Sequence, residues 1–292
     1  MNAMRLNPIC TILLILLLGF AAPGYCLDEI RIQPGSSEED LRHTYPIALL
    51  MKALEATAES DGPFRITPGQ VRMSRDRALE EIASGKHINL YIAATRNTWE
   101  ERTIPIRIPI MKRLLSYRLL LINCRDMDRF AKIDSLQALK QLKGGTGLQW
   151  TITEVHRRHG FTLVTGNDYE GLFSMLDSGR FDYFSRGINE IFTEYETRKE
   201  RFPDMCIEPT LALYSPSPSY FFVSPAYPKL ADRIRRGMEI ISANGELDAL
   251  FQKHFGADIA RAKLKERTVF RIDNPLLSKE TPLDRPELWF TP

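Results

Sequence analysis

Two stretches of the chain repeat one pattern of hydrophobic and polar positions. Residues 78–92 and 172–184 each run from an amphipathic helical turn through Ser-Gly and a basic residue, then an Asn or Asp, into an apolar strand. A glycine after a helix is the usual C-cap, because it enters the left-handed region at little steric cost. Any α/β protein contains one such unit by chance, but two with matching centres favour two similar lobes. Ligands commonly bind in the cleft between two lobes.

Hydrophobic periodicity predicts the other elements of the first half of the chain. Alternation predicts strands over 29–33 and 64–67, and helical spacing predicts a helix that Tyr45-Pro46 opens. Isoleucines alternate with prolines over 104–110, which indicates an edge strand or an irregular extended path. The most apolar run after the N-terminal segment is 114–122, and it is long enough for a strand that crosses from one lobe to the other.

The segments after residue 122 alternate between helical and extended patterns, as an α/β series does. Helices are expected over 135–142, 151–158, 169–176, 188–201, 230–243 and 246–255. Strands are expected over 161–164, 181–184, 205–213 and 219–223. A tail punctuated by prolines follows and ends in Leu288-Trp289-Phe290. Disorder is one interpretation of that tail, and its apolar end favours packing back onto the protein at least as strongly.

The N-terminus has the pattern of a secretory signal. Arg5 supplies the positive region, and 9–20 is an apolar run too short to span a bilayer, which needs about 20 such residues. Cleavage near Gly24 or Cys26 would leave an exported protein of the periplasm. A lipoprotein anchor at Cys26 is the less favoured alternative, because the bulky Tyr25 precedes it.

Composition narrows the class of protein. A hydrophobic fraction of 43% is that of an ordinary globular chain. The 39 basic and 37 acidic residues nearly balance, so we expect no nucleic-acid partner. Cys124 and Cys206 are the cysteines beyond the signal. They would pair in an oxidising compartment if the fold brings them together, or else remain two buried thiols.

The segment 220–225 and the residues after it carry a resemblance to a known family. They read Tyr-Phe-Phe-Val-Ser-Pro, then Leu230, Ile234, Gly237-Met238, Gly245-Glu246-Leu247 and Phe255-Gly256. This pattern resembles the C-terminal part of extracellular solute-binding proteins of family 3, the polar-amino-acid type served by ABC transporters. The order of elements agrees with that family from about Leu27 to Gly256.

The resemblance implies an α/β, two-lobed periplasmic-binding-protein-like fold of type II, with two crossover strands. Behind a signal peptide at 1–26, one lobe would comprise 27–121 plus 220–292 and the other 122–219. The implied function is capture of a small polar or anionic solute, amino-acid-like or a carboxylate, for ABC-type uptake. The implied partners are this small-molecule ligand and a membrane permease, and we expect a monomer without a cofactor. A periplasmic sensor that signals to a membrane partner is the alternative, and an enzymatic relative of the fold is a third.

The family's first-lobe motif is Thr-x-x-Arg, whose arginine clamps the ligand α-carboxylate. The matching stretch here is 95–102, in which Thr98 and Arg102 are four residues apart instead of three. We expect Thr98 and Arg102 to contact ligand, with Arg96 as the substitute for Arg102. The alternative for Arg102 is a solvated helix residue paired with a neighbouring acid.

The family's second lobe supplies main-chain N–H groups and a Ser or Thr at a helix start, where the helix dipole favours a carboxylate. Thr151 and Thr153 occupy that place, and each is a competent N-cap with or without a ligand. Trp150, Tyr45 and Trp99 are the aromatic candidates for stacking on ligand, and a core role fits each equally well.

The sequence departs from the family where an acid should hold the ligand ammonium. Arg186-Gly187 stands there, and Asp182 matches a residue with a structural role. An arginine that faces the cleft would favour an anionic group such as a second carboxylate; otherwise Arg186 points away and is structural. Asn189 or Glu190 could take over part of the acid's role.

No pattern indicates catalysis or a metal. His156 and His159 are three apart on one expected helix, without a third ligand at recognisable spacing. The chain has no Gly-x-Ser-x-Gly motif, and neither Cys124 nor Cys206 has a recognisable catalytic context. We therefore expect a protein with no chemistry of its own.

Overall fold

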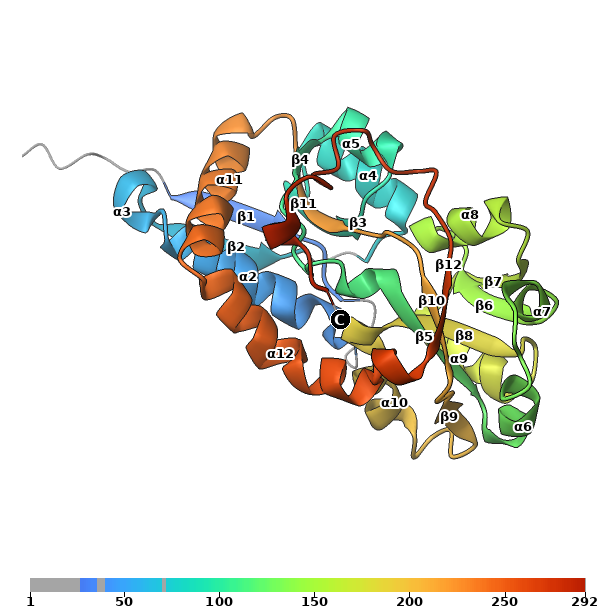
Figure 1. The fold of residues 1–292 in the computed structure, drawn as a ribbon. Coiled ribbons are helices and arrows are strands. Elements are labelled where there is room, and N and C mark those ends of the chain that lie inside the picture. The colour runs from blue at the N-terminus through green and yellow to red at the C-terminus, as the bar shows by residue number, and fades with distance from the viewer. Residues whose placement is uncertain (1–26, 36–39, 70–71, 292) are drawn as a thin grey trace, which may run out of the picture.

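A computed structural model describes residues 27–35, 40–69 and 72–291, so the predicted signal at 1–26 lies outside the described residues. The molecule has two lobes (Figure 1). Among the described helices, none combines the length and the apolar character that a membrane crossing requires.

The first lobe contains two small sheets. β1 (Asp28–Ile32) pairs in parallel with β2 (Phe64–Pro68). β11 (Ser219–Val223) lies between β3 (Leu90–Ala94) and β4 (Ile104–Ile106), antiparallel to both. The chain thus returns to this sheet at β11, after the strands of the second lobe.

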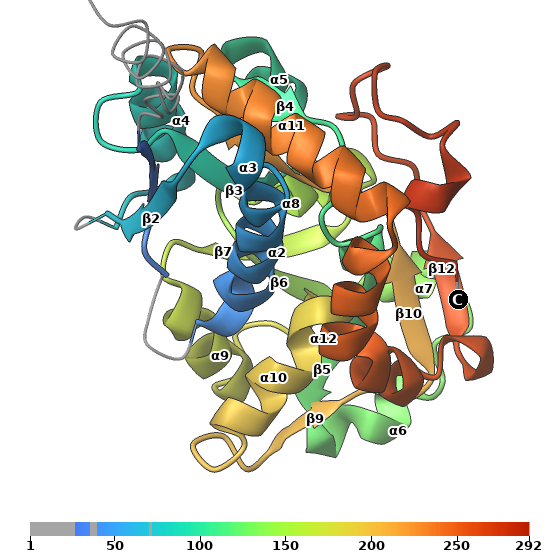
Figure 2. The same ribbon diagram turned by 90° about the vertical axis from the view of Figure 1, so that its left-hand side faces the viewer.

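Helices from both ends of the chain cover these sheets (Figure 2). α2 (Thr44–Glu55) packs against α11 (Pro228–Ala243), and α12 (Glu246–Ala262) follows. A Cβ at Gly237 would lie 2.0 Å from the Ala53 carbonyl oxygen, so only glycine permits this close approach of α2 and α11. The remaining helices of this lobe are α3 (Ala58–Asp61), α4 (Arg75–Ser84) and α5 (Asn97–Arg102).

The second lobe is built on one mixed sheet with the order β12-β10-β5-β8-β6-β7, and β9 pairs with β5 on the edge opposite β8, which β10 also uses. Its strands are β5 (Tyr117–Asn123), β6 (Lys143–Gly147), β7 (Thr162–Gly166), β8 (Tyr183–Gly187), β9 (Met205–Ile207), β10 (Leu211–Tyr214) and β12 (Thr268–Arg271). Its helices are α6 (Met127–Phe130), α7 (Leu136–Lys140), α8 (Thr151–Arg158), α9 (Tyr169–Asp177) and α10 (Ile188–Arg198). Every residue of β5 is buried, including the polar Arg118 and Asn123.

The repeated helix–glycine–strand pattern is confirmed in both lobes. α4 ends at Gly85, whose φ is 68°, and β3 follows. α9 is followed by Gly179, whose φ is 69°, and then by β8. Both glycines occupy the left-handed region that a side chain would strain.

The two cysteines form a disulfide. Cys124 follows β5, and Cys206 lies in the neighbouring β9. The register of these strands sets Ile122 opposite Cys206 and brings the two cysteine Cα atoms to 5.1 Å. The pairing of β5 with β9 therefore explains why the two cysteines form a disulfide, which their separation in the sequence could not predict.

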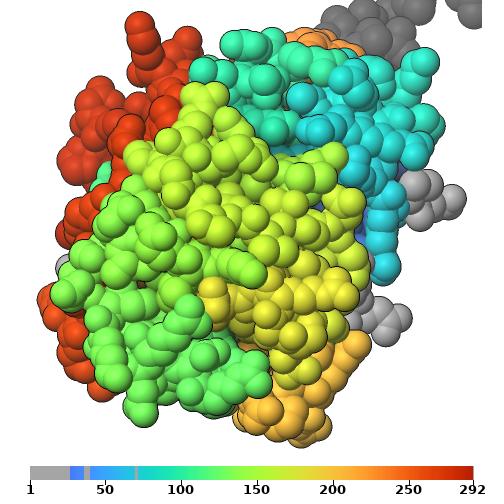
Figure 3. Space-filling view, turned by 90° about the vertical axis from the view of Figure 1, so that its right-hand side faces the viewer, coloured from blue at the N-terminus to red at the C-terminus, as the bar shows by residue number. Residues whose placement is uncertain are grey.

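The tail belongs to both lobes, which differs from its expected place in the first lobe alone. β12 pairs in parallel with β10 and so extends the sheet of the second lobe (Figures 1 and 2). The chain then returns to the first lobe, where Arg107 pairs with Glu280 and Lys112 accepts a backbone hydrogen bond from Phe290. Figure 3 shows the tail along one side of the second lobe.

The last helix is longer than predicted. The expected helix covers 246–255, but α12 continues through Gly256 to Ala262. Ala262 is fully buried and Ile259 packs against the main core, so burial of the final turn outweighs the cost of a glycine within a helix.

Candidate functional site

A cavity of about 790 Å³ lies between the two lobes. The first lobe lines it with the region around β3 and the start of α4, and the second lobe with the starts of α8, α9 and α10. Five of the lining residues are arginines, namely Arg42, Arg72, Arg75, Arg118 and Arg186, whereas the acidic lining residues are Asp168 and Glu190. The cleft that the repeat predicts is therefore present, and its walls are rich in cationic side chains.

Arg75 is the cation at one end of the cavity. It is the first residue of α4, behind the N-cap Ser74, and its Nη2 donates to the carbonyl oxygen of Ala94. Its buried Nε has no hydrogen-bond partner, and no carboxylate among the described residues forms an ion pair with it. Burial lowers the pKa of Arg75 to about 10. The guanidinium therefore remains charged at neutral pH, but without a counterion.

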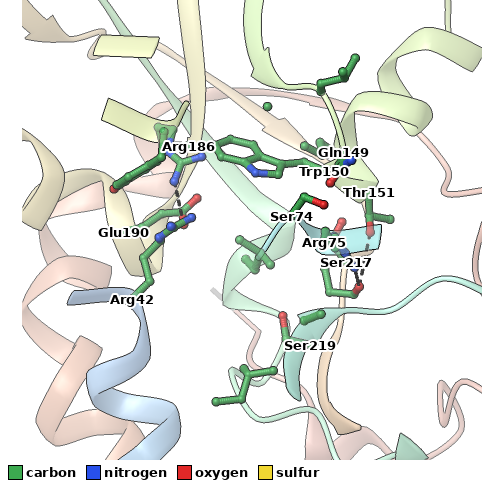
Figure 4. A pocket seen from close by; sticks show the side chains of 18 of the residues that line it. Arg42, Ser74, Arg75, Gln149, Trp150, Thr151, Arg186, Glu190, Ser217 and Ser219 are labelled. Carbon is green, nitrogen blue, oxygen red and sulfur yellow. Dashed lines mark hydrogen bonds and ion pairs between the residues drawn. The ribbon is translucent and has the colours of Figure 1, made fainter. Parts of the chain in front are cut away.

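The second lobe faces Arg75 with the start of α8. Thr151 Oγ1 donates to the Ala94 carbonyl oxygen over 3.3 Å, and no side chain caps the N-terminus of the helix. The buried hydroxyl of Ser217 lies nearby and has no hydrogen-bond partner (Figure 4). Arg75, Thr151, Ser217 and the first N–H groups of α8 form a set of donors that we call the Arg75 end.

Thr153 lies behind this end. Its hydroxyl donates to the Gly147 carbonyl oxygen over 2.6 Å and lies 2.7 Å from the Thr146 hydroxyl. The side chain is fully buried and does not line the cavity. These bonds tie the first turn of α8 to β6, so the role of Thr153 in this structure is structural.

A buried ionic cluster forms the opposite end. The Nε and Nη2 of Arg186 donate to the two carboxylate oxygens of Glu194 over 2.7 and 2.6 Å, and Nη2 lies 3.0 Å from Glu190. Burial alone would lower the pKa of Arg186, but the two carboxylates outweigh it and raise that pKa. Arg186 therefore reaches the cavity wall with its charge already balanced.

Glu190, which the sequence offered as a partial substitute for the family's acid, lines the cavity. Its Oε1 accepts the Gly187 N–H over 3.0 Å, so the carboxylate folds back over the start of α10. Glu190 therefore brings a carboxylate to the cavity wall, but that carboxylate is already paired with Arg186.

Arg118 lies beside this cluster. It projects from β5, is 3% exposed, and donates from Nε and Nη2 to the hydroxyl and carbonyl oxygens of Ser185. Its nearest carboxylate, that of Glu190, is 3.9 Å away. Burial lowers the pKa of Arg118 to about 10. We call Arg42, Arg118, Arg186 and Glu190 the Glu190 end.

Aromatic rings connect the two ends. The indole of Trp150 stacks on Phe184 with an interplanar angle of 15°, and the Arg186 guanidinium lies 4.6 Å from the indole centre. Figure 4 shows the indole between Arg75 and Arg186. At the Glu190 end, Arg42 from the first lobe lies 4.0 Å from the Tyr169 ring of the second lobe.

The structure brings Trp150, Thr151 and Arg186 to the cavity and places the other predicted residues elsewhere. Tyr45 is buried in the first lobe, 4.7 Å from the ring of Phe255. Arg102 makes a bidentate pair with Glu80 at 2.5 and 2.6 Å on the outer surface, and Thr98 is exposed one helical turn before it. These positions correct the expected placement, because α5 carries its polar residues away from the cleft.

The alternative candidates in the same segment also lie outside the cavity. Arg96 donates to Asp76 over 2.9 Å. Trp99 is fully buried and stacks on Tyr91 with ring centres 4.7 Å apart.

Arg75 and Arg118 were missed, although each has a sequence signal. Arg118 is the only charged residue in the apolar run 114–122, and an arginine in a buried strand needs a partner or a function. Arg75 stands in the first turn of a helix, where the dipole disfavours a cation. A cation in that position indicates a role other than helix stability.

Comparisons with known proteins bear on the fold. No family model matches the chain, and no curated protein matches it. An ancestral arginine-binding protein bound to arginine is 19% identical, with a TM-score of 0.55 over 78% of this chain and 98% of that one. A His/Glu/Gln/Arg/opine-family binding protein from Silicibacter pomeroyi, in complex with lysine, is 11% identical, with a TM-score of 0.55 over 78% and 98%.

A third solved structure connects the fold to an enzyme. An ancestral amino-acid-binding protein described as a precursor of cyclohexadienyl dehydratase is 14% identical, with a TM-score of 0.53 over 78% of this chain and 95% of that one. In each of the three comparisons, the match includes nearly the whole length of the solved structure. The predicted two-lobed fold of periplasmic binding proteins is confirmed.

Proposed function

We propose that this chain is an exported solute-binding protein that captures a small amino-acid-like or carboxylate solute between its lobes. One observation carries the proposal: Arg75 lines the cleft opposite the uncapped N-terminus of α8, and it has no counterion in the part of the chain that the structure describes. A ligand carboxylate would serve as the acceptor for both the Arg75 guanidinium and the first N–H groups of α8, since each is a strong hydrogen-bond donor to a carboxylate.

Ligand binding would couple the two lobes. A carboxylate at the Arg75 end would bridge α4 of the first lobe and α8 of the second. A ligand that contacts both lobes stabilises the closed state over an open one, because the open state makes only half of those contacts. The bridge thus supplies the differential affinity that a hinged binding protein needs.

Delivery to an ABC-type permease is the first candidate for the next step, because the similar solved structures are amino-acid-binding proteins. A sensor that signals to a membrane partner would use the same cleft and a different docking surface. Genes for a permease and an ATPase beside this one would favour transport, and a membrane receptor gene would favour sensing.

An enzymatic relative of the fold is the least supported candidate. The enzyme precursor among the similar structures is itself described as an amino-acid-binding protein. The buried carboxylates near the cavity, Glu190 and Glu194, are engaged with Arg186. Binding without chemistry is the simplest use of these side chains.

A ligand screen tests the proposal. Thermal unfolding of the purified protein would be followed with amino acids, dicarboxylates, small peptides and polyamines, since a ligand of the native state raises the midpoint by mass action. We expect a rise with a carboxylate-bearing amino acid or dicarboxylate. A rise with polyamines alone, or with no compound of the panel, would contradict the proposal.

A further inference from the structure

Resting on the proposed function, we infer that the cleft selects a small solute that carries two carboxylate groups. Short dicarboxylic acids and acidic amino acids share this chemistry. The basic and neutral amino acids do not.

The charges on the cavity wall favour a net negative ligand. Five arginines line the cavity against Asp168 and Glu190. Asp40 pairs with Arg42, and Glu190 and Glu194 pair with Arg186, so the excess of positive charge comes from Arg72, Arg75 and Arg118. Asp168 already accepts the Gly171 N–H at 2.7 Å as the N-cap of α9. A ligand with a basic side chain would therefore add a cation close to arginines that have no carboxylate of their own among the described residues, which costs free energy by like-charge repulsion.

Glu190 is poorly placed to recruit a basic side chain. One of its oxygens accepts the Gly187 N–H, and the other lies 3.0 Å from Arg186. Drawing Glu190 toward a ligand cation would break these bonds and leave Arg186 with Glu194 as its remaining partner. Among the described residues that line the cavity, both carboxylates are thus already engaged, and neither is free for the side chain of a lysine or arginine ligand.

The two ends each offer a cation with spare hydrogen-bonding capacity. At the Arg75 end, Nε of Arg75 and the hydroxyl of Ser217 are buried without partners. At the Glu190 end, the Nε and Nη2 of Arg118 donate to Ser185. Its Nη1 has no hydrogen-bond acceptor among the described residues. A ligand with two carboxylates could therefore accept hydrogen bonds at both ends, one carboxylate at the Arg75 end and the other at the Glu190 end.

The space between the ends suits a short apolar chain. Figure 4 places Arg75, Thr151 and Ser217 on one side of the cavity and Arg42, Arg186 and Glu190 on the other, with the Trp150 indole between them. A short diacid has methylene groups between its two carboxylates. The face of an indole ring packs well against such methylene groups. The arrangement therefore matches the length and the polarity of such a ligand.

Isothermal titration calorimetry with six ligands tests the inference. The dicarboxylate set is succinate, glutarate and glutamate, and the comparison set is glutamine, lysine and arginine. We expect the best dicarboxylate to bind at least tenfold more tightly than any compound of the comparison set. Binding of glutarate and glutamate alike would show that two carboxylates suffice, whereas binding of glutamate alone would show that the ammonium is also recognised; both results support the inference.

Contrary results separate the inference from the proposed function. If glutamine, lysine or arginine binds as tightly as the best dicarboxylate, the inference is overturned and the binding function stands. If none of the six ligands binds, and the wider panel is also silent, the proposed function fails and the inference fails with it.

Arg118→Gln tests the second carboxylate site directly. We expect it to weaken glutamate binding at least tenfold and glutamine binding by less than threefold, and Arg118→Lys to retain part of the preference. The control is Arg102→Gln, which changes an arginine outside the cavity. An equal loss for both ligands would remove Arg118 from charge selection. If Arg118→Gln does not fold, the ligand ranking of the unmodified protein decides the matter.

Discussion

Thr151, the first residue of α8 in the second lobe, donates a hydrogen bond to the carbonyl oxygen of Ala94 in the first lobe. The same oxygen accepts from Arg75. The two lobes therefore meet through main-chain and side-chain groups at the place where a ligand carboxylate would bind. A carboxylate there would exchange this 3.3 Å bond for stronger, charge-assisted ones.

Thr151→Val should weaken ligand binding about three- to tenfold, because the hydroxyl donor is lost while the shape is kept. A neutral hydrogen bond is worth about 0.5–1.5 kcal/mol, which corresponds to that range. Thr151→Ser keeps the donor and is the matched control. Calorimetry on the best ligand of the screen measures both, and equal affinity of all three proteins would show that the hydroxyl makes no ligand contact.

Glu194→Gln should destabilise the fold strongly, because it leaves Arg186 buried with one of its two carboxylates missing. Breaking a buried ion pair by removing one partner costs about 3–5 kcal/mol. Urea unfolding measures the loss. The surface pair of Arg157 and Glu154 offers a control, since exposed pairs contribute about 0–1 kcal/mol. A loss for Glu194→Gln no larger than for Glu154→Gln would contradict the assignment.

The same carboxylate predicts a loss of stability in acid. Burial opposes ionisation of Glu194, but Arg186 outweighs it and holds the pKa of that carboxyl below its usual range. A group whose pKa is lowered by folding contributes stability above its unfolded pKa and loses it as the pH falls through the folded value. Stability should therefore fall below the ordinary carboxyl range, and the fall should be shallower in Glu194→Gln.

His156 predicts a second loss that begins at higher pH. The ring is 2% exposed and stacks on Phe161 with centres 4.5 Å apart, and burial lowers the pKa of His156 to about 3. The unfolded chain binds this proton near pH 6.5 and the folded chain does not, so stability decreases as the pH falls between these values. At pH 4.5 the loss is about 3 kcal/mol.

The His156→Leu variant isolates that effect. Its free energy of unfolding, measured by urea titration from pH 8 to pH 4.5, should depend less on pH than that of the unmodified protein. Parallel pH profiles of the two proteins would show that His156 is protonated in the folded state.

The lobes, the repeat and the second-lobe helix start could be predicted from the sequence because each rests on local chemistry. Gly85 and Gly179 end their helices where a left-handed residue is required, and α8 begins at Thr151 as its pattern indicates. The arginine that we propose as the carboxylate ligand could not be found in the same way. Arg75 and Arg102 lie on neighbouring first-lobe helices, and the direction of each side chain relative to the second lobe decides which one reaches the cleft.

The tail shows the same limit. Its apolar end predicted packing, and Trp289 is indeed 7% exposed, with its Nε1 donating to the Pro282 carbonyl oxygen over 2.8 Å. That β12 joins the sheet of the second lobe depends on the free edge of β10, which no local pattern in the tail reveals.

Trp289→Ala should therefore destabilise the protein by about 3–5 kcal/mol, as removal of a buried tryptophan does. The Arg113 guanidinium 4.7 Å above the ring would lose its contact as well. Ligand affinity should change less than threefold, since Trp289 does not line the cavity. Leu283→Ala, at a residue that is 58% exposed, is the control. Urea unfolding that gives the same midpoint for both variants would contradict the packing of the tail.

The most direct test of the central claim, that Arg75 binds a ligand carboxylate, is calorimetry on Arg75→Met and Arg102→Met with the best ligand of the screen. We predict that Arg75→Met weakens binding more than tenfold, or by more than about 1.4 kcal/mol, while Arg102→Met leaves the affinity unchanged within twofold. Unchanged affinity in a folded Arg75→Met protein, or a larger loss in Arg102→Met, would contradict the claim.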